Sequence, residues 1–336
     1  MLCKTSVARS VFKEVKRTGA CFDCFEAYEF DAKRVFGISA SACLLLIRLS
    51  DCGISSDECP VYSLDSPDQQ TGAFGFRNGH FYNDLSLHGY DFEGRCCFEW
   101  RQGVKHDCAK VMELAVKDGH FVNGSKETAL LEDALVYPLV KSSMFKSPVI
   151  STFTRFVIVT QRKARADTSF IRTSAPRTWK YLNDHMAYFQ KRKSAIYKDA
   201  PAFSMFGVGD YSFSQYKVGV SGFYKTPLFS LLHSPGGKAV MTDDTSYFIC
   251  FDSYDLAYAA MLCLNSRPVQ VFLKSIAFQD AKRPYTKKVL GRLDFAKICA
   301  TLRLGDLLDV ERRFSLPPHI SEEIFLKFKS LCGASS

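Results

Sequence analysis

Residues 192–225, RKSAIYKDAPAFSMFGVGDYSFSQYKVGVSGFYK, interleave basic and aromatic side chains more densely than any other part of the chain. The basic residues attract phosphates, and the aromatic rings offer flat faces on which nucleobases stack. From Tyr211 to Ser221 the apolar residues roughly alternate, which predicts a half-buried strand after a glycine turn. The stretch therefore predicts a nucleic-acid-binding surface, although an aromatic-rich β core with a solvated basic face has the same composition.

The same stretch contains a motif that is easily mistaken for a cofactor loop. Phe206-Gly207-Val208-Gly209-Asp210 is similar to the FxGxG loop that holds S-adenosylmethionine in methyltransferases. Such a loop follows a buried strand and opens a helix. The next residues in this chain, YSFSQYKVGV, have the period of a strand. We therefore do not expect this segment to bind a cofactor.

Length and composition bound the class of protein. The chain has 336 residues, 47% of them hydrophobic, which is enough for two globular domains, and its net charge of +9 favours an anionic partner. The apolar run 41–49 is too short to cross a bilayer and contains Arg48, and the first residues lack the apolar region of a secretory signal. We expect a cytoplasmic protein that does not engage a membrane.

The cysteines point to the same compartment. There are 13 of them, an odd number without regular spacing, so reduced thiols are expected instead of a disulfide framework. Cys21 and Cys24 form a CxxC pair, but a structural zinc site needs a second pair, and none has the required spacing. We expect no metal.

The N-terminal residues 1–50 are typical of the end of an α/β unit. Residues 7–15 have helical spacing, and Gly19 follows as a stop signal. Residues 26–30 predict a short strand, and SACLLLIRL (41–49) predicts a fully buried one, with DAKRVFG as the loop between them. These elements make the edge of a sheet, and we expect the front of that domain to lie outside this chain.

The middle of the chain begins with the expected domain boundary. Residues 51–80 are rich in proline and glycine and predict a loop. Asn123-Gly124 is a hairpin turn signal, and residues 135–145 are an apolar run ended by Lys141 and two serines. Residues 155–163 predict a buried strand that leads into a basic loop. A basic cluster then occupies residues 162–198.

Helical patterns occur within and after the basic cluster. Residues 175–192 predict a helix whose apolar stripe is core packing. The stripe consists of Trp179, Leu182, Met186 and Phe189. Residues 238–251 predict a strand interrupted by a turn at Asp243-Asp244, and residues 255–266 and 321–331 predict helices.

Several segments together resemble the C-terminal half of adenine-N6 DNA methyltransferases of the restriction–modification type. They occur in the family's order and cover most of the chain: residues 1–12, 26–37, 100–114, 137–145, 178–225, 241–249 and 265–294. The long block TWKYLNDHMAYFQKRKSAIYKDAPAFSMFGVGDYSFSQYKVGVSGFYK (178–225) is the specific one, and the shorter segments are individually weak.

The resemblance implies a division of labour. In that family an N-terminal Rossmann-like domain holds S-adenosylmethionine and carries an Asn/Asp-Pro-Pro-aromatic catalytic loop, and a C-terminal domain recognises the DNA target. Neither N-terminal motif occurs in this chain; Pro317-Pro318 lacks the polar residue before it and the aromatic residue after it. The resemblance therefore implies S-adenosylmethionine for the complete enzyme but no cofactor for this chain alone. It also implies a partner chain carrying the cofactor-binding and catalytic half.

We accordingly expect an α/β fragment, the end of a Rossmann-like methyltransferase sheet, in residues 1–55. A linker (56–85) and an α+β target-recognition domain (86–336) complete the expected organisation. The expected function is to bind double-stranded DNA and position the target adenine. Two alternatives remain open: a non-catalytic DNA-binding specificity subunit, or an inactive truncated remnant.

The expected DNA contacts come from the basic segments and from rings beside the glycine turn. The candidate DNA-binding residues are Arg101, Lys105, Lys141, Arg162, Lys163, Arg192, Lys193, Tyr197, Lys198, Phe206, Tyr211, Lys217, Lys225, Lys282 and Arg283. No residue is expected to be catalytic in this chain.

Overall fold

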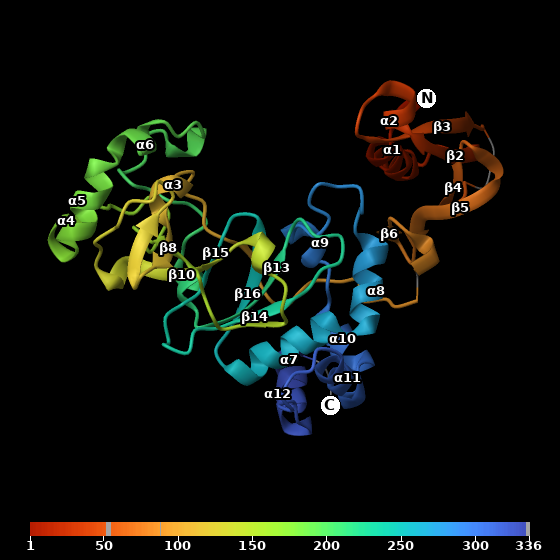
Figure 1. Cartoon of the computed structure of the whole chain (residues 1–336). Helices are drawn as coiled ribbons and strands as arrows, with labels where there is room; N and C mark the ends of the chain where they lie inside the picture. The colour runs from red at the N-terminus through yellow and green to blue at the C-terminus, as the bar shows by residue number, and fades with distance from the viewer. Residues whose placement is uncertain (52–54, 88, 334–336) are drawn as a thin grey trace.

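The computed structural model describes residues 1–51, 55–87 and 89–333. Its helices and strands form a mixed α and β structure in which strands belong to three sheets. Figure 1 shows the first sheet at one end of the molecule and helices α4–α6 at the other, with a third sheet and the C-terminal helices between them.

The first sheet has the strand order β1-β3-β2-β4-β5-β6. Its strands are β1 (Leu2–Lys4), β2 (Phe22–Asp31), β3 (Ser41–Leu49), β4 (Glu58–Ser63), β5 (Ser66–Arg77) and β6 (His80–Tyr82). β2 and β4 are parallel, and the other neighbours are antiparallel. The expected helix is α1 (Thr5–Thr18), which ends at Gly19 with a φ of 71°, and the strand expected over 41–49 is β3.

The prediction that β3 is fully buried is wrong. Helix α1 covers one face of the sheet, where the Phe12 ring contacts Phe25 and Phe74 and where Leu45 is buried. On the other face Leu44 is 42% exposed and Leu46 is 49% exposed. A run of leucines does not distinguish a strand covered on both faces from one covered on a single face.

The predicted loop over 51–80 and linker over 56–85 contain three strands instead. β4 pairs with β2, β5 pairs with β4 and β6 pairs with β5, so this segment continues the first sheet. The register of β4 against β5 shifts at Val61–Tyr62, and Gly75 has a φ of 157° where its α-carbon approaches the carbonyl of Asp57. The glycines that suggested a loop therefore lie in strands with irregular pairing. Residues 52–54 of the predicted loop lie outside the described part of the chain.

The predicted loop DAKRVFG also contains regular structure. Its residues form a short helix, α2 (Ala32–Phe36), between β2 and β3. The Asp31 side chain caps this helix by accepting from the N–H groups of Lys33 and Arg34. An aspartate before a short polar segment is a helix-start signal as well as a loop signal, and here the capping bonds favour the helix.

The second sheet has the strand order β15-β10-β12-β8-β9. Its strands are β8 (Glu113–Lys117), β9 (His120–Asn123), β10 (Val136–Val140), β12 (Arg155–Ile158) and β15 (Met241–Thr242). The segments that precede and cover it form α3 (Ala109–Met112), α4 (Ile171–Ser174), α5 (Pro176–Asp184) and α6 (Met186–Gln190). The predicted apolar stripe packs into its core, with Leu182 and Phe189 buried. At the predicted turn, the Asn123 side chain accepts from the N–H groups of Ser125 and Glu127.

The third sheet has the strand order β11-β14-β13-β16-β7. Its strands are β7 (Arg101–Gln102), β11 (Val149–Ile150), β13 (Tyr216–Ser221), β14 (Ser230–Leu232) and β16 (Ser246–Phe251). The predicted half-buried strand from Tyr211 to Ser221 starts only at Tyr216, because Asp210–Phe213 form a 3-10 turn. β13 is almost entirely buried because it pairs with β14 and β16 and also packs against a helix. The turn expected at Asp243-Asp244 separates β15 from β16.

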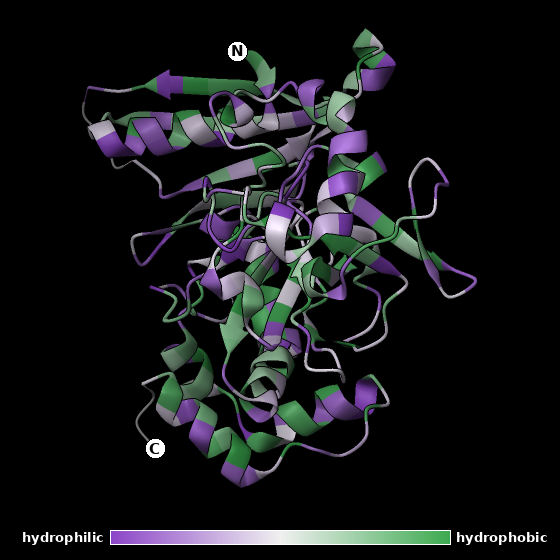
Figure 2. Cartoon of the chain, turned by 90° about the vertical axis from the view of Figure 1, so that its left-hand side faces the viewer, coloured by the Kyte–Doolittle hydropathy of each residue, from purple (hydrophilic) through white to green (hydrophobic). Residues whose placement is uncertain are grey.

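The main hydrophobic core lies between the third sheet and the C-terminal helices. These helices are α7 (Tyr254–Asn265), α8 (Arg267–Ile276), α9 (Lys287–Leu290), α10 (Phe295–Thr301), α11 (Leu304–Arg313) and α12 (Glu322–Leu331). Figure 2 shows hydrophilic and hydrophobic residues alternating along the helices near the C-terminus, as expected for helices that bury one face. Ser321 caps α12 by accepting from Ile324 N–H.

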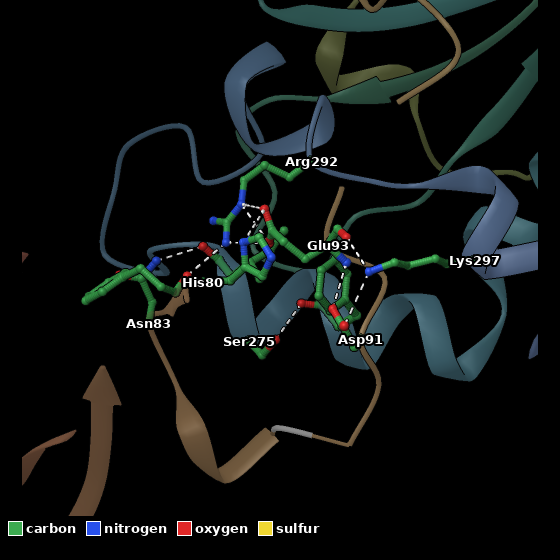
Figure 3. A network of polar contacts seen from close by, with 10 residues as sticks. His80, Asn83, Asp91, Glu93, Ser275, Arg292 and Lys297 are labelled. Carbon is green, nitrogen blue, oxygen red and sulfur yellow. Dashed lines mark hydrogen bonds and ion pairs between the residues drawn. The ribbon is translucent and has the colours of Figure 1, made fainter. Parts of the chain in front are cut away.

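Polar contacts join the first sheet to the C-terminal part of the chain (Figure 3). Arg292 makes three hydrogen bonds of 2.6–3.0 Å to the buried carboxylate of Glu93 and donates a fourth to the Phe81 carbonyl. The Asn83 N–H donates to the Ser275 carbonyl at 2.7 Å. Bidentate pairing with a buried carboxylate fixes orientation as well as distance. The network therefore positions β6 against α8.

Candidate nucleic-acid interface

The segment Arg101–Asp107 brings together candidates that are far apart in sequence. The Arg101 guanidinium lies 4.4 Å from the centre of the Tyr211 ring. Lys105 and Phe206 exchange two backbone hydrogen bonds of 2.8 Å each, which holds the glycine turn against this segment. Two distant parts of the chain therefore meet at a backbone bridge, and their basic and aromatic side chains meet with them.

The aromatic rings beside the glycine turn are packed against other side chains. The Tyr197 and Phe206 rings meet edge to face at 5.4 Å, and the Arg192 guanidinium lies 3.8 Å from the centre of the Tyr197 ring. Arg192 also donates to the Ser204 carbonyl at 2.6 Å. Burial lowers the pKa of Arg192 and raises the pKa of Tyr197. Arg192, Tyr197 and Phe206 are thus half-buried and held in one orientation.

Two further arginines lie on aromatic rings at the margin of this group. The Arg162 guanidinium is 3.9 Å from the centre of the Phe213 ring. Arg283 lies 5.0 Å from the Phe223 ring and donates to the Asp244 carbonyl at 3.3 Å. Contacts of this kind hold a guanidinium in place while leaving it charged. We call Arg101, Lys105, Arg162, Arg192, Tyr197, Phe206, Tyr211 and Arg283 the cation–aromatic surface.

The remaining lysines differ in exposure. Lys193, Lys198, Lys225 and Lys282 are exposed, as is Lys163, whose amine lies 3.9 Å from Asp210. Lys141 is half-buried and makes two hydrogen bonds of 2.8 and 2.9 Å to Glu113. An amine that is already paired with a carboxylate attracts a phosphate less strongly than an unpaired amine does. The exposed lysines are therefore the better candidates for backbone contacts.

Lys217 is not part of a surface, and its assignment to a DNA contact is wrong. It is 1% exposed, and its amine donates to the carbonyls of Ser214 and Val240 at 2.7 and 2.9 Å. Burial lowers the pKa of Lys217 to about 8. The alternation along β13 turns Lys217 away from Val218, into the space beside Val240, where DNA cannot reach it.

The Phe206–Asp210 segment does not fit a cofactor loop. Gly207 has a φ of 66°, and a β-carbon there would collide with the Gly103 carbonyl. The backbone that a phosphate or a nucleoside would approach is therefore already packed against another segment. The next element along the chain is the short 3-10 turn Asp210–Phe213, not the N-terminus of an α-helix.

The sequence reasoning missed two exposed rings in the connection between β13 and β14. Phe223 and Tyr224 are each 37% exposed. Both lie in the basic and aromatic stretch, but the strand pattern before them favoured the rings nearer the glycine turn. The available signal was the pair of adjacent aromatics between Gly222 and Pro227, outside the alternation expected for a buried strand.

Metal binding and membrane insertion require other arrangements of residues. Within residues 1–51, 55–87 and 89–333, no group of three or more His, Cys, Asp or Glu side chains is arranged to hold a metal ion. None of the helices in the described part of the chain has the length and apolar content needed to cross a membrane.

Comparisons with known proteins identify a relative among methyltransferases. No family profile matches the chain. The chain shares 34% identity over 297 residues with the type II methyltransferase M.NspV of Nostoc sp., an alignment that covers 88% of this chain and 62% of that protein. A solved structure of the type IIL restriction-modification enzyme MmeI in complex with DNA aligns with a TM-score of 0.46 and 12% identity, covering 98% of this chain and 45% of that one. The chain is thus homologous to a type II methyltransferase and spans about three fifths of that relative's length.

Proposed function

We propose that this chain is the DNA-recognition portion of a site-specific adenine-N6 DNA methyltransferase of a restriction–modification system. In this role it binds duplex DNA and positions the target adenine. The observation that carries the proposal is the cation–aromatic surface, in a chain that is 34% identical to a type II methyltransferase. Neither feature alone would be sufficient, because cation–π pairs also occur in proteins that bind no nucleic acid.

The charges of the surface suit two kinds of DNA contact. The exposed lysines at positions 193, 198 and 282 can neutralise phosphates, which gives affinity without sequence preference. The arginines that lie on rings are already held in place, so little conformational entropy is lost when they bind. Guanidinium groups held in this way can read guanine edges through two hydrogen bonds.

Methylation of a base inside a duplex requires that base to leave the stack. In the complete enzyme, S-adenosylmethionine would supply the methyl group. The Phe206–Asp210 segment does not fit that cofactor, so we assign its binding and the catalytic loop to polypeptide beyond this chain. We expect calorimetric titration of the isolated chain with S-adenosylmethionine to show no binding, and micromolar binding would overturn this assignment.

The first sheet supports the presence of such additional polypeptide. In the described part of the chain, β1 pairs only with Ala42–Leu44 of β3, so the outer edge of β3 beyond Leu45 has no partner strand. The uncovered face beside this edge carries Leu2, Leu44 and Leu46. An open edge next to exposed leucines favours the addition of a strand and a covering element.

Binding-site selection from a random duplex pool tests the proposal. The chain should enrich one short sequence motif, and its affinity should fall steeply with salt. A chain that enriched no motif and bound all duplexes equally would be a general DNA-binding protein. A chain that bound no duplex at low salt would contradict the proposal entirely. Adding the catalytic half of a related enzyme then separates a methylation role from a purely DNA-binding one.

A further inference from the structure

The connection between β13 and β14, residues 222–226, is an anchored loop. The Gly222 N–H donates to the Thr245 carbonyl at 2.9 Å, and the Phe223 N–H donates to the Ser221 hydroxyl at 3.2 Å. At the far side of the loop, the Lys225 carbonyl accepts from the Tyr285 hydroxyl at 2.9 Å. Both ends are therefore fixed. We call residues 222–226 the aromatic loop.

Two aromatic rings project from this loop, and their contacts differ. Phe223 is 37% exposed, and the Arg283 guanidinium lies 5.0 Å from its ring centre. Tyr224 is equally exposed, and no described residue makes an aromatic or cation–π contact with its ring. Two adjacent exposed rings on a fixed loop are unusual for a surface that only contacts water. They indicate a surface built for contact with a ligand.

The aromatic loop stands between the first sheet and the second. Phe223 borders a cavity of about 590 Å³ whose lining includes Lys105 and Lys141 as well as the carboxylates of Asp107, Glu113, Asp243 and Asp244. Lys225 borders a separate cavity of about 770 Å³ at the ends of the parallel strands β2 and β4, lined by Asp31 and others. The residues on either side of Tyr224 in the chain thus line two different cavities. Figure 1 shows this central position of the β13–β14 region between the two ends of the molecule.

Charged residues of both signs surround the loop. Asp243 and Asp244 line the cavity beside Phe223, and Glu29, Asp31 and Asp280 line the cavity beside Lys225. The cations come from the segment that follows α8. Arg283 and the exposed Lys282 belong to this segment, which packs against the loop through the Arg283–Phe223 contact and the Tyr285–Lys225 hydrogen bond. Cations around exposed rings match the surface of duplex DNA, where phosphates flank a stack of flat bases.

We propose that Tyr224 is a wedge that enters the base stack of bound DNA and fills the space left when a base rotates out. This inference rests on the proposed function and adds a residue to it. Unstacking a base step is unfavourable, and an inserted ring restores part of the stacking that the DNA gives up. Phe223, held by Arg283, helps to fix the loop that carries Tyr224, and Lys225 and Lys282 contact the neighbouring phosphates.

A duplex that lacks one base provides the test, because its stack is already interrupted. The wild-type chain should bind a duplex with a single abasic site more tightly than the matched intact duplex, by about 5- to 150-fold. Tyr224→Ala should bring this ratio close to one, and Tyr224→Trp should preserve it. The slope of log affinity against log salt should stay unchanged in both variants, because neither removes a phosphate contact.

Tyr188→Ala is the matched control. Tyr188 is 38% exposed on α6, within the basic part of the chain but away from the aromatic loop. This variant should keep the wild-type ratio even if its overall affinity changes. Equal wild-type affinity for abasic and intact duplexes, or a ratio that survives Tyr224→Ala, would overturn the wedge while leaving DNA recognition in place. Failure to bind either duplex would overturn both.

Discussion

The guanidinium of Arg192 lies 3.8 Å from the centre of the Tyr197 ring, and the same group donates to the Ser204 carbonyl at 2.6 Å. The basic and aromatic residues of the central stretch therefore already contact one another within the chain, in the absence of a partner. This arrangement unites the two interpretations that the composition left open. The rings are partly core, and the cations that lie on them are held at the surface of that core.

Charge reversal at exposed lysines should weaken DNA binding. Lys193→Glu, Lys198→Glu and Lys282→Glu should each lower the slope of log affinity against log salt by about one for every phosphate that is no longer neutralised. Fluorescence anisotropy over a range of salt concentrations measures this slope. Lys327→Glu is the control, because Lys327 is also exposed but lies on α12, where it pairs with Glu323. Unchanged affinity in all three variants would show that the lysines form a solvated face.

Two substitutions of Tyr197 should separate the contribution of its ring from that of its hydroxyl. Tyr197→Ala removes the ring that supports Arg192 and Phe206, and should lower the free energy of unfolding by about 1–3 kcal/mol and weaken DNA binding as well. Tyr197→Phe should retain both properties, because the buried hydroxyl makes no hydrogen bond of normal geometry to any described residue. Thermal unfolding and DNA affinity are measured on the same proteins. Reduced stability with intact affinity would make Tyr197 a purely structural residue.

Lys217 should make stability depend on pH in the alkaline range. Its pKa is lowered from 10.5 to about 8 in the folded state by burial, so between these values the unfolded chain binds more protons. Stability should therefore rise as the pH increases from about 8 to about 10.5, by at most about 1.4 kcal/mol per pH unit from this group. Denaturant unfolding at several pH values measures the rise. Lys217→Met should abolish this contribution, and an identical pH profile in the variant would contradict it.

The uncovered face of the first sheet should promote association when the chain is isolated. Leu46→Lys places a charge among the exposed leucines and should reduce self-association in light scattering. Leu326→Lys is the matched control, since Leu326 on α12 is 47% exposed and Leu46 is 49% exposed. A wild-type chain that stays monomeric, with β3 fully protected in hydrogen exchange, would argue against a missing partner for this sheet.

Local patterns in the sequence determined several elements on their own. The spacing of apolar residues and Gly19 predicted α1, the run 41–49 predicted β3, and the pattern of residues 321–331 predicted α12. Each of these depends on a period or a cap within a few residues of the chain. The apolar stripe of α5 and α6 was predictable for the same reason.

Contacts between distant residues decided the rest. Lys217 is buried because β13 lies between β14 and β16, and its own sequence neighbours do not encode that position. The pairing of β4–β6 with the first sheet and the exposure of Tyr224 likewise depend on which segments fold against them. Whether a residue carries a charge or an aromatic ring can be read from the sequence. Whether they face solvent, a carbonyl or another ring is set by partners that lie far away along the chain, and only the tertiary structure brings those partners together.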